Sequence, residues 1–221
     1  MCVNFIPPSP QQLREHFKVQ LDTSTGWPTE TWQDYAAPII LQEDGTSKAV
    51  LASFGMIPKQ HLPAGVRIST MNARAETIGQ LKTYRHAWHN AHLCLVPMLG
   101  FFEPCYESGK AERWKISMAD GEPFAVAGLW RAWNEAEGDI RHSFTQITIN
   151  ADEHPLMKRM HKPGDEKRSL VIVPADQYQD WLNCKDSEVT RSFLALYPST
   201  KMAAQAVPRK TDKNTGNLNL F

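Results

Sequence analysis

The stretch Ala-Pro-Ile-Ile-Leu-Gln-Glu-Asp-Gly-Thr-Ser-Lys-Ala-Val-Leu-Ala, residues 37–52, carries the clearest fold signal in this chain of 221 residues. Two short apolar runs, at 39–41 and 49–51, lie on either side of Asp44-Gly45. Asp-Gly between two apolar runs is typical of the tight turn of a β-hairpin. Residues 37–52 therefore predict two antiparallel strands joined by a short turn.

Further strands are predicted by short apolar or β-branched runs along the chain. These runs are residues 93–97, 114–118, 124–130, 144–149 and 170–173. An Ala-Asp-Gly-Glu turn separates the second run from the third, so these two are predicted to form another hairpin. Many short strands with a few helices between them indicate a single α+β domain with a mainly antiparallel sheet.

Three helices are predicted. Ser9 is an N-cap candidate, followed by Pro10 at the first helical position and Gln12 three residues after the cap. A second helix is predicted over residues 77–90, where apolar side chains recur at three- and four-residue steps, and a third begins near Tyr178. We expect one domain over residues 1–221, with a loosely ordered polar tail from about residue 201.

The charges of the chain are balanced, with 24 Lys and Arg residues against 24 Asp and Glu residues and a formal net charge of zero. Proteins that coat nucleic acid by bulk charge need a large excess of Lys and Arg. The composition excludes that class of protein. It remains compatible with a confined basic groove.

The sequence predicts a soluble protein of the cytoplasm, nucleoid-associated if its source is bacterial, and a monomer. No run approaches about 18 consecutive apolar residues, so no membrane partner is expected. The N-terminus lacks the charged lead and apolar run of a signal peptide. The four cysteines have no Cys-x-x-Cys spacing, which argues against disulfides and a zinc knuckle; they are Cys2, Cys94, Cys105 and Cys184.

Cys2 is the most unusual residue. Removal of the initiator Met would leave it with a free α-amine beside its thiol, groups with ordinary pKa values of about 7.7–8.0 and about 8.5. A 1,2-aminothiol reacts with an aldehyde: the amine forms an imine, the thiol adds to it, and a thiazolidine ring closes. On position alone, an ordinary residue near the terminus is the better interpretation of Cys2.

Polar residues at the ends of predicted elements are further candidates. Asn72 and Arg74 lie where an alternating run meets the second predicted helix, and a guanidinium such as Arg74 can hold a phosphate through two hydrogen bonds. Glu103 follows apolar Gly-Phe-Phe, surroundings that disfavour an ionised carboxylate and suit acid–base chemistry. His161 lies in a basic loop. Each also has an ordinary interpretation, as a turn residue, a surface ion pair or a solvated side chain.

A zinc site is the alternative suggested by His86, His89 and His92, which recur at three-residue steps and precede Cys94. On a helix the third His has turned well away from the first, and no carboxylate or paired cysteine completes the set. A solvated polar face is the preferred interpretation. We expect neither a metal nor another cofactor.

Several segments, taken together in chain order, resemble one known family. They are Met1-Cys2, Ala37-Pro38, Gly55-Met56-Ile57-Pro58, Asn72-Ala73-Arg74-Ala75-Glu76-Thr77, Cys94-Leu95-Val96-Pro97, Gly100-Phe101-Phe102-Glu103, residues 124–130, and the His161 loop running into residues 170–173. This pattern is similar to the SOS-response-associated peptidase (SRAP) family, whose members include shields of abasic DNA sites. The resemblance extends from Cys2 to about Leu182, and its Asn-Ala-Arg-x-Glu-Thr and Gly-Phe-x-Glu motifs are the most specific.

The resemblance implies an open, barrel-like, mainly antiparallel sheet with packed helices and a positively charged groove for single-stranded DNA with abasic sites. It implies that Cys2 captures the aldehyde of an abasic site as a thiazolidine DNA–protein crosslink. Asn72 would then position Cys2, and Arg74 would grip a flanking phosphate. Glu103 would move protons to and from the amine, and His161 would assist opening of the deoxyribose ring and reversal of the crosslink. The peptidase name is interpreted as self-processing at the N-terminus.

One departure from the family pattern concerns DNA contacts. Family members commonly continue from Met-Cys with Gly-Arg, whereas Val3-Asn4 follow Cys2 here. The lost arginine removes one phosphate contact. A basic loop is predicted to line the same groove and to compensate, through Lys158, Arg159, Lys162, Lys167 and Arg168.

Two other functions stay open. An N-terminal-nucleophile amidohydrolase, such as a glutaminase, also begins with Met-Cys and uses the thiol to attack an amide. A non-catalytic single-strand DNA binding module would combine a basic groove with aromatic stacking.

Overall fold

The computed structural model describes residues 2–21, 26–135 and 138–207, and its larger sheet closes on itself as a barrel. The barrel strands follow the order β9-β3-β2-β5-β8, and β8 pairs again with β9. They are β2 (Ala36–Glu43), β3 (Thr46–Phe54), β5 (Leu93–Met98), β8 (Phe124–Asn134) and β9 (Ile140–Asn150). The predicted mainly antiparallel, barrel-like sheet is confirmed, with β3 and β9 as a parallel pair within the barrel.

Strand β9 changes partners along its length. Its first half pairs with β8 and β3, and its second half pairs with two short strands outside the barrel. These are β4 (Asn72–Arg74), parallel to β9, and β10 (Arg168–Leu170), antiparallel to it. A third short strand, β11 (Ile172–Val173), pairs with β8.

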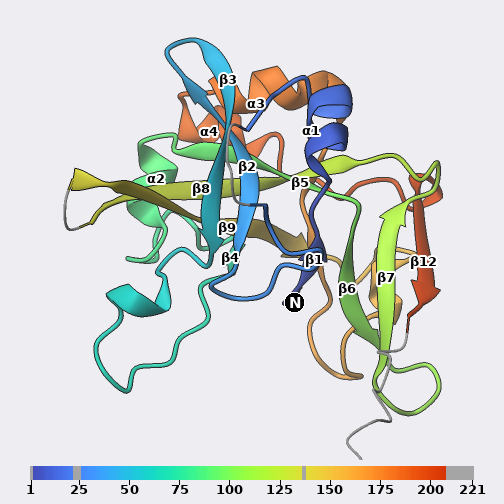
Figure 1. Cartoon of the computed structure of the whole chain (residues 1–221). Coiled ribbons are helices and arrows are strands. Elements are labelled where there is room, and N and C mark those ends of the chain that lie inside the picture. Colours follow the sequence, from blue (N-terminus) through green and yellow to red (C-terminus); the bar gives the residue numbers. More distant parts are fainter. Residues whose placement is uncertain (1, 22–25, 136–137, 208–221) are drawn as a thin grey trace, which may run out of the picture.

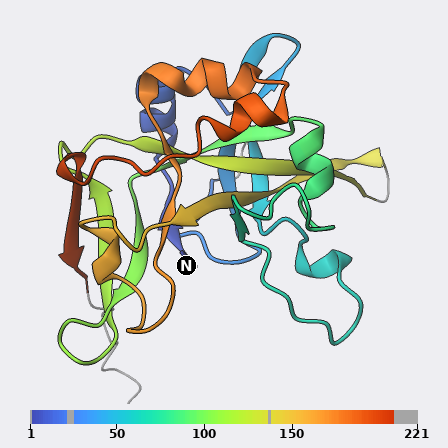
Figure 2. The same cartoon turned by 180° about the vertical axis from the view of Figure 1, so that it is seen from behind.

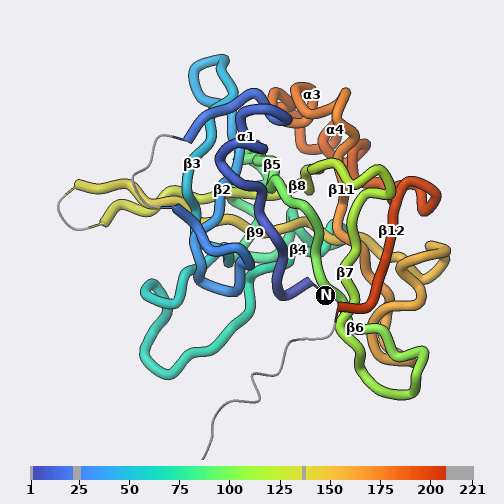
Figure 3. The backbone as a smooth tube through the Cα atoms, turned by 45° about the vertical axis from the view of Figure 1, so that its right-hand side comes forward, coloured from blue at the N-terminus to red at the C-terminus, as the bar shows by residue number. Residues whose placement is uncertain are grey.

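A smaller antiparallel sheet packs beside the barrel (Figure 1). Its order is β1 (Phe5–Ile6), β6 (Gly100–Cys105), β7 (Glu112–Met118) and β12 (Met202–Ala206). The start of β1 lies between the two sheets, as the tube in Figure 3 also shows. The tail expected to be loose from about residue 201 thus begins as a paired edge strand, and residues 208–221 lie outside the described ranges.

Two apolar clusters hold the fold together. One contains Cys2 and Phe5, and joins the barrel strands to the smaller sheet. The other lies on the opposite face of the barrel strands, where Leu13, Trp88 and Trp181 bring helices onto the sheet. Figure 2 shows these helices from behind. Because these strands are covered on both faces, all of β5 and the first six residues of β8 are buried.

The first predicted hairpin is confirmed, since β2 and β3 pair from Ala36↔Ser53 to Glu43↔Thr46. Asp44 and Gly45 both have positive φ, 49° and 77°, as a type I′ turn requires. The second predicted hairpin is wrong: β7 pairs with β6 and β12, whereas β8 pairs with β5, β9 and β11. Residues 124–129 are buried on both faces and need barrel neighbours, which a local turn signal does not reveal.

Helix α1 (Pro10–Phe17) begins as predicted. The Gln12 N–H donates to Ser9 Oγ at 3.2 Å, and the Ser9 N–H donates to Gln12 Oε1 at 2.9 Å, which completes a capping box. The predicted third helix is α3 (Tyr178–Asn183), followed by α4 (Ser187–Arg191). Short 3₁₀ helices are η1 (Lys59–His61), η3 (Met157–Arg159), η4 (Ala175–Gln177) and η5 (Ser199–Lys201). Within the described ranges, no helix has the length and apolar character to cross a membrane.

The helix predicted over residues 77–90 is shortened to α2 (Arg85–His89), and turns precede it. Ile78 and Tyr84 are buried in the same apolar cluster. In one continuous helix, six residues of rotation would make these side chains point about 120° apart. The turns bring both to the core, and Leu81, three residues after Ile78, is left exposed.

The capping box gives a test of local stability. Ser9→Ala should lower the free energy of unfolding by about 1 kcal/mol, because N–H groups of the first turn lose their acceptor. Urea denaturation measures the change. Gln11→Ala, on the same exposed turn, is the control and should change stability by less than about 0.5 kcal/mol. Equal effects of the two substitutions would contradict a stabilising cap.

Candidate functional site

The N-terminal segment and strand β4 meet at Cys2 and Asn72. Asn72 Nδ2 donates a hydrogen bond to the Cys2 carbonyl oxygen at 2.7 Å. The Cys2 thiol donates to the Asn4 carbonyl at 3.3 Å, and the Cys2 residue is fully buried. The Tyr84 hydroxyl in turn donates to the Asn72 carbonyl at 3.2 Å. Cys2 is therefore held through its own main chain by a residue of β4, the short strand that pairs with β9.

Glu103 and His161 form a buried pair between β6 and the loop that follows η3. Glu103 Oε2 lies 3.0 Å from His161 Nε2, and the side chains are 3% and 7% exposed. His161 has a φ of 64°, a left-handed conformation that residues other than Gly rarely adopt. Its N–H donates to the Pro104 carbonyl at 2.7 Å, and Cys105 and Met160 form a β-bridge beside it. These main-chain contacts hold the imidazole against β6.

The Cys2 thiol is electrostatically linked to Glu103. Burial raises the pKa of the Cys2 thiol, and the charge of Glu103 raises it further. The thiol is therefore protonated at neutral pH in this environment. The four residues predicted as catalytic thus form one connected group, in which Asn72 holds Cys2, Cys2 lies in the field of Glu103, and Glu103 contacts His161.

Arg168 is not placed as predicted. Its side chain is only 3% exposed, and its NH1 and NH2 groups both donate to the Glu76 carboxylate at 2.8 Å. NH1 also donates to Glu166 Oε1 at 2.6 Å, and NH2 donates to the Thr148 carbonyl. A buried guanidinium with these partners does not line a groove. Arg168 instead braces Glu166, which holds Arg74 NH1 at 2.8 Å.

The other predicted cations lie at the surface, and two of them are paired. Arg74 is about half exposed in its ion pair with Glu166, and Arg159 makes two 2.8 Å hydrogen bonds with Glu107. Lys158 and Lys162 are exposed. Carboxylates of this chain therefore offset part of the predicted positive track.

Lys167 ties down the loop that carries His161. Its ammonium donates to the carbonyl of His161 at 3.3 Å and to that of Lys162 at 2.8 Å. This lysine was predicted to line the groove, and in the structure its ammonium points back to the main chain. The bonds keep the loop close to β10 and limit the movement of His161.

A network beside Cys2 gave no sequence signal. The Glu30 Oε2 atom accepts from Asn4 Nδ2 at 2.9 Å and from Arg113 NH2 at 2.7 Å. The Arg113 guanidinium lies 3.3 Å above the centre of the Phe102 ring. A cavity of about 290 Å³ adjoins this network and has Glu103 in its wall. Arg113 thus supplies a positive charge beside Asn4, where the family pattern leads one to expect an arginine.

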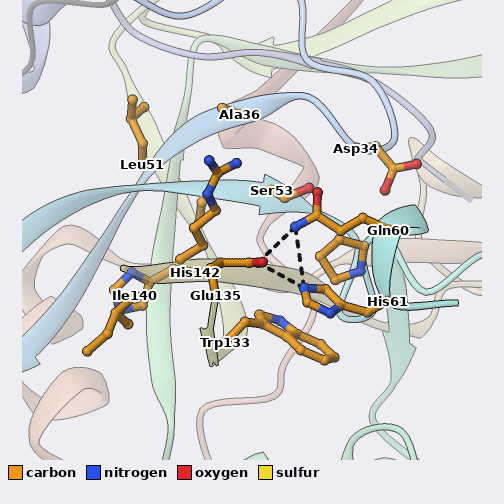
Figure 4. Close-up of a pocket in the computed structure, with 13 residues that line it drawn as sticks. Asp34, Ala36, Leu51, Ser53, Gln60, His61, Trp133, Glu135, Ile140 and His142 are labelled. Carbon is orange, nitrogen blue, oxygen red and sulfur yellow. Dashed lines mark hydrogen bonds and ion pairs between the residues drawn. The ribbon is translucent and has the colours of Figure 1, made fainter. Parts of the chain in front are cut away.

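Another cavity, beside the start of β9, contains none of the predicted site residues. It has a volume of about 430 Å³ and is lined by parts of β2, β3, β8, β9 and η1 (Figure 4). In it, Glu135 Oε1 accepts from Gln60 Nε2 at 2.8 Å and lies 3.1 Å from His61 Nε2. The His61 ring stacks on Trp133 with centroids 3.9 Å apart. These groups satisfy one another and brace the hairpin of β8 and β9.

The histidines weighed as a zinc site do not converge. The His86 and His92 rings lie 5.7 Å apart, whereas His89 Nε2 contacts the Gly79 carbonyl at 3.0 Å. Among the residues that the structure describes, no group of three His, Cys, Asp or Glu side chains has the arrangement to hold a metal ion.

The fold and site define a class of single-domain β protein in which the second residue, a cysteine, is held by an amide beside a buried Glu–His pair. The sequence model of the SOS response associated peptidase (SRAP) family matches residues 1–214. The chain belongs to this family.

Individual relatives agree with that assignment. A protein of Bordetella bronchiseptica with a known crystal structure is 35% identical, with a TM-score of 0.82, and the match covers 94% of this chain and 100% of that one. A Bacteroides thetaiotaomicron structure, 22% identical with a TM-score of 0.75 over 93% and 92% of the two chains, has the same fold. The abasic site processing protein YobE of Bacillus subtilis (strain 168) is 28% identical over 171 residues, 76% of this chain and 74% of its own.

The bracing role of Arg168 is testable by stability against pH. Arg168→Met should lower the free energy of unfolding by about 2 kcal/mol at pH 7, because charge-assisted hydrogen bonds are lost. The hydrogen bond from Arg168 lowers the pKa of Glu166. A lowered carboxyl pKa contributes stability above the ordinary value near 4.3 that is lost as the pH falls through the lowered value. The difference between variant and wild type should therefore shrink below about pH 4.

Urea denaturation at pH 7 and pH 3.5 measures both differences. Lys162→Met, at an exposed position of the loop before β10, is the control and should change stability by less than about 0.5 kcal/mol. A difference of the same size at both pH values would show that Arg168 acts by packing alone.

Proposed function

We propose that this protein binds single-stranded DNA and captures abasic sites covalently through Cys2, forming a thiazolidine DNA–protein crosslink in the DNA damage response. The amine of Cys2 adds to the ring-opened aldehyde, and water leaves to give an imine. The thiol sulfur then adds to the imine carbon, and its proton ends on nitrogen. Atoms balance without an oxidant, a reductant or a metal. The name of the Bacillus subtilis relative YobE, an abasic site processing protein, supports the same substrate.

The observation that carries the proposal is the anchoring of Cys2 by Asn72, from a segment 70 residues away in sequence. A residue near a frayed terminus needs no such partner. The bond engages the Cys2 carbonyl and not the α-nitrogen or the thiol. The thiol, which donates to the Asn4 carbonyl, has to leave that partner to react. The amine exists only after Met1 has been removed. The family is named for a peptidase activity, and we assign that activity in this protein only to the removal of Met1.

Glu103 and His161 supply the proton transfers. Loss of water from the carbinolamine needs an acid, and opening of the deoxyribose ring needs a base and an acid. A carboxylate 3.0 Å from an imidazole can share one proton between both groups and deliver it in either direction. Since burial and Glu103 keep the Cys2 thiol protonated, ring closure also needs a base for the thiol proton. Glu103 is the acidic group whose charge acts on that thiol.

Contacts with the DNA backbone are assigned to Arg74, Lys158, Arg159 and Lys162. A phosphate must compete with Glu166 for Arg74 and with Glu107 for Arg159, so each contact gains less than a free cation would provide. The expected encounter is weak and sensitive to salt, and one covalent bond makes it durable. A chain with zero net charge suits that mode of binding.

The covalent step is tested with a single-stranded oligonucleotide that bears one abasic site. Wild type should give a heat-stable adduct on a denaturing gel, and both Cys2→Ala and chemical blocking of the N-terminal amine should abolish it. Cys184→Ala is the matched control, because this free thiol is partly exposed and should not react in the same way. A stable adduct with Cys2→Ala, or Met1 retained in the mature protein by mass spectrometry, would overturn the proposal.

The backbone contacts are tested without the covalent step, using an oligonucleotide with a tetrahydrofuran abasic analogue that has no aldehyde. Replacing Lys158 and Lys162 by Glu should weaken binding and reduce the slope of log K against log salt by about 0.7 for each lost contact. Lys18→Glu is the control, because Lys18 lies at the end of α1, where it donates to the Glu15 carbonyl, and is not among the residues assigned to the DNA. Unchanged binding by the double variant would remove the loop from the DNA interface.

A further inference from the structure

Strand β9 carries a buried amide that the proposed chemistry does not use. Gln146 is 0% exposed, and neither its Oε1 nor its Nε2 has a hydrogen-bond partner among the described residues. A buried primary amide left without partners costs folding free energy, and buried polar side chains are nearly always hydrogen-bonded. An apolar side chain of similar size would fill the same space without that cost. Gln146 is therefore a position that core packing alone does not explain.

Gln146 lies directly beside Asn72. The two are in-register partners in the parallel pair of β4 and β9, and the Gln146 N–H donates to the Met71 carbonyl at 2.9 Å. The next pair along, Ala73 and Ile147, packs in the cluster under the helices. Because side chains alternate between faces along a strand, Asn72 and Gln146 both face the side on which Cys2 lies.

One atom of the Asn72 side-chain amide takes no part in the hydrogen bond with Cys2. Its Nδ2 donates to the Cys2 carbonyl, whereas its Oδ1 is buried and has no partner among the described residues. Adjacent strands lie about 4.8 Å apart, and in-register Asn and Gln side chains on such strands form hydrogen-bonded amide ladders. At that spacing, the Gln146 side chain is long enough for its Nε2 to reach Asn72 Oδ1 in another rotamer. One bond would then satisfy two of the three unpaired atoms.

We propose that Gln146 is a positioning residue, whose Nε2 donates to Asn72 Oδ1 and so fixes the Asn72 amide for its bond with Cys2. The bond selects the amide orientation in which Nδ2, and not Oδ1, faces the Cys2 carbonyl. It also polarises the Asn72 amide, which strengthens Nδ2–H as a donor. Its consequence for crosslinking rests on the proposed function, whereas the hydrogen bond itself does not.

The kinetic test is a double-mutant cycle. Gln146→Leu should slow adduct formation by wild type about fivefold, the change expected for one ordinary hydrogen bond. In an Asn72→Ala background the same substitution should change the rate less than twofold, because its target is gone. Gln146→Leu should lower the melting temperature in the wild-type background, where it leaves the buried Asn72 Oδ1 without its donor, and should not lower it in the Asn72→Ala background. The proposal would be overturned if Gln146→Leu slowed the reaction equally in both backgrounds, or if it did not slow the reaction of the otherwise wild-type protein.

Ile147→Val is the matched control for disturbance of β9. It removes one methylene group from the neighbouring buried residue, on the other face of the strand. It should lower the melting temperature and leave the crosslinking rate unchanged. If Ile147→Val slows the reaction as much as Gln146→Leu does, the effect belongs to the strand and the assignment of Gln146 fails.

A measurement without DNA keeps the two proposals apart. In NMR spectra of wild type, the side-chain NH₂ signals of Gln146 should exchange slowly with solvent and should shift in Asn72→Ala. Unshifted signals would overturn the hydrogen bond even where wild type forms adducts. If wild type forms no adduct and the signals shift, the proposed function fails and the hydrogen bond stands.

Discussion

The hydrogen bond from Asn72 to the carbonyl of Cys2 ties the N-terminus to the barrel, and the candidate site depends on it. The bond exists because β9 continues past the barrel and pairs there with β4. The same continuation pairs with β10, the strand that ends the His161 loop. One long strand therefore sets the positions of Asn72, Arg74 and the loop together. Movement of any one of them is resisted by a shared backbone ladder.

The arginines near the site are paired with carboxylates, which fixes the orientation of the guanidinium groups more than it attracts DNA. Arg168 is buried and donates hydrogen bonds to Glu76 and Glu166, and Glu166 in turn orients Arg74. Arg113 is oriented in the same way by Glu30, above the Phe102 ring. Pairing each guanidinium with a carboxylate fixes its geometry and reduces the net field at the surface. The balance of charge in the composition thus has a structural counterpart at the site itself.

Local signals predicted local structure well. The Asp44-Gly45 turn and the Ser9–Gln12 capping box are each set by residues a few positions apart, and both form as predicted. The hairpin predicted from residues 114–118 and 124–130 is wrong, because the partners of β8 come from distant segments. The helix predicted over residues 77–90 failed because Ile78 and Tyr84 had to reach one core. Glu30, Arg113 and Gln146 carried no signal, since an isolated polar residue looks the same in a sequence whether it is buried or exposed.

The sequence by itself determined the family pattern, the mainly antiparallel α+β class and the chemical potential of a cysteine at position 2, because these follow from residue identity and short spacing. Only the tertiary structure decided which residues meet. It connected Asn72, Cys2, Glu103 and His161, and it took Arg168 and the Lys167 ammonium out of the predicted groove. The reason is physical: burial and pairing arise from strand neighbours tens of residues apart, and no local pattern encodes them.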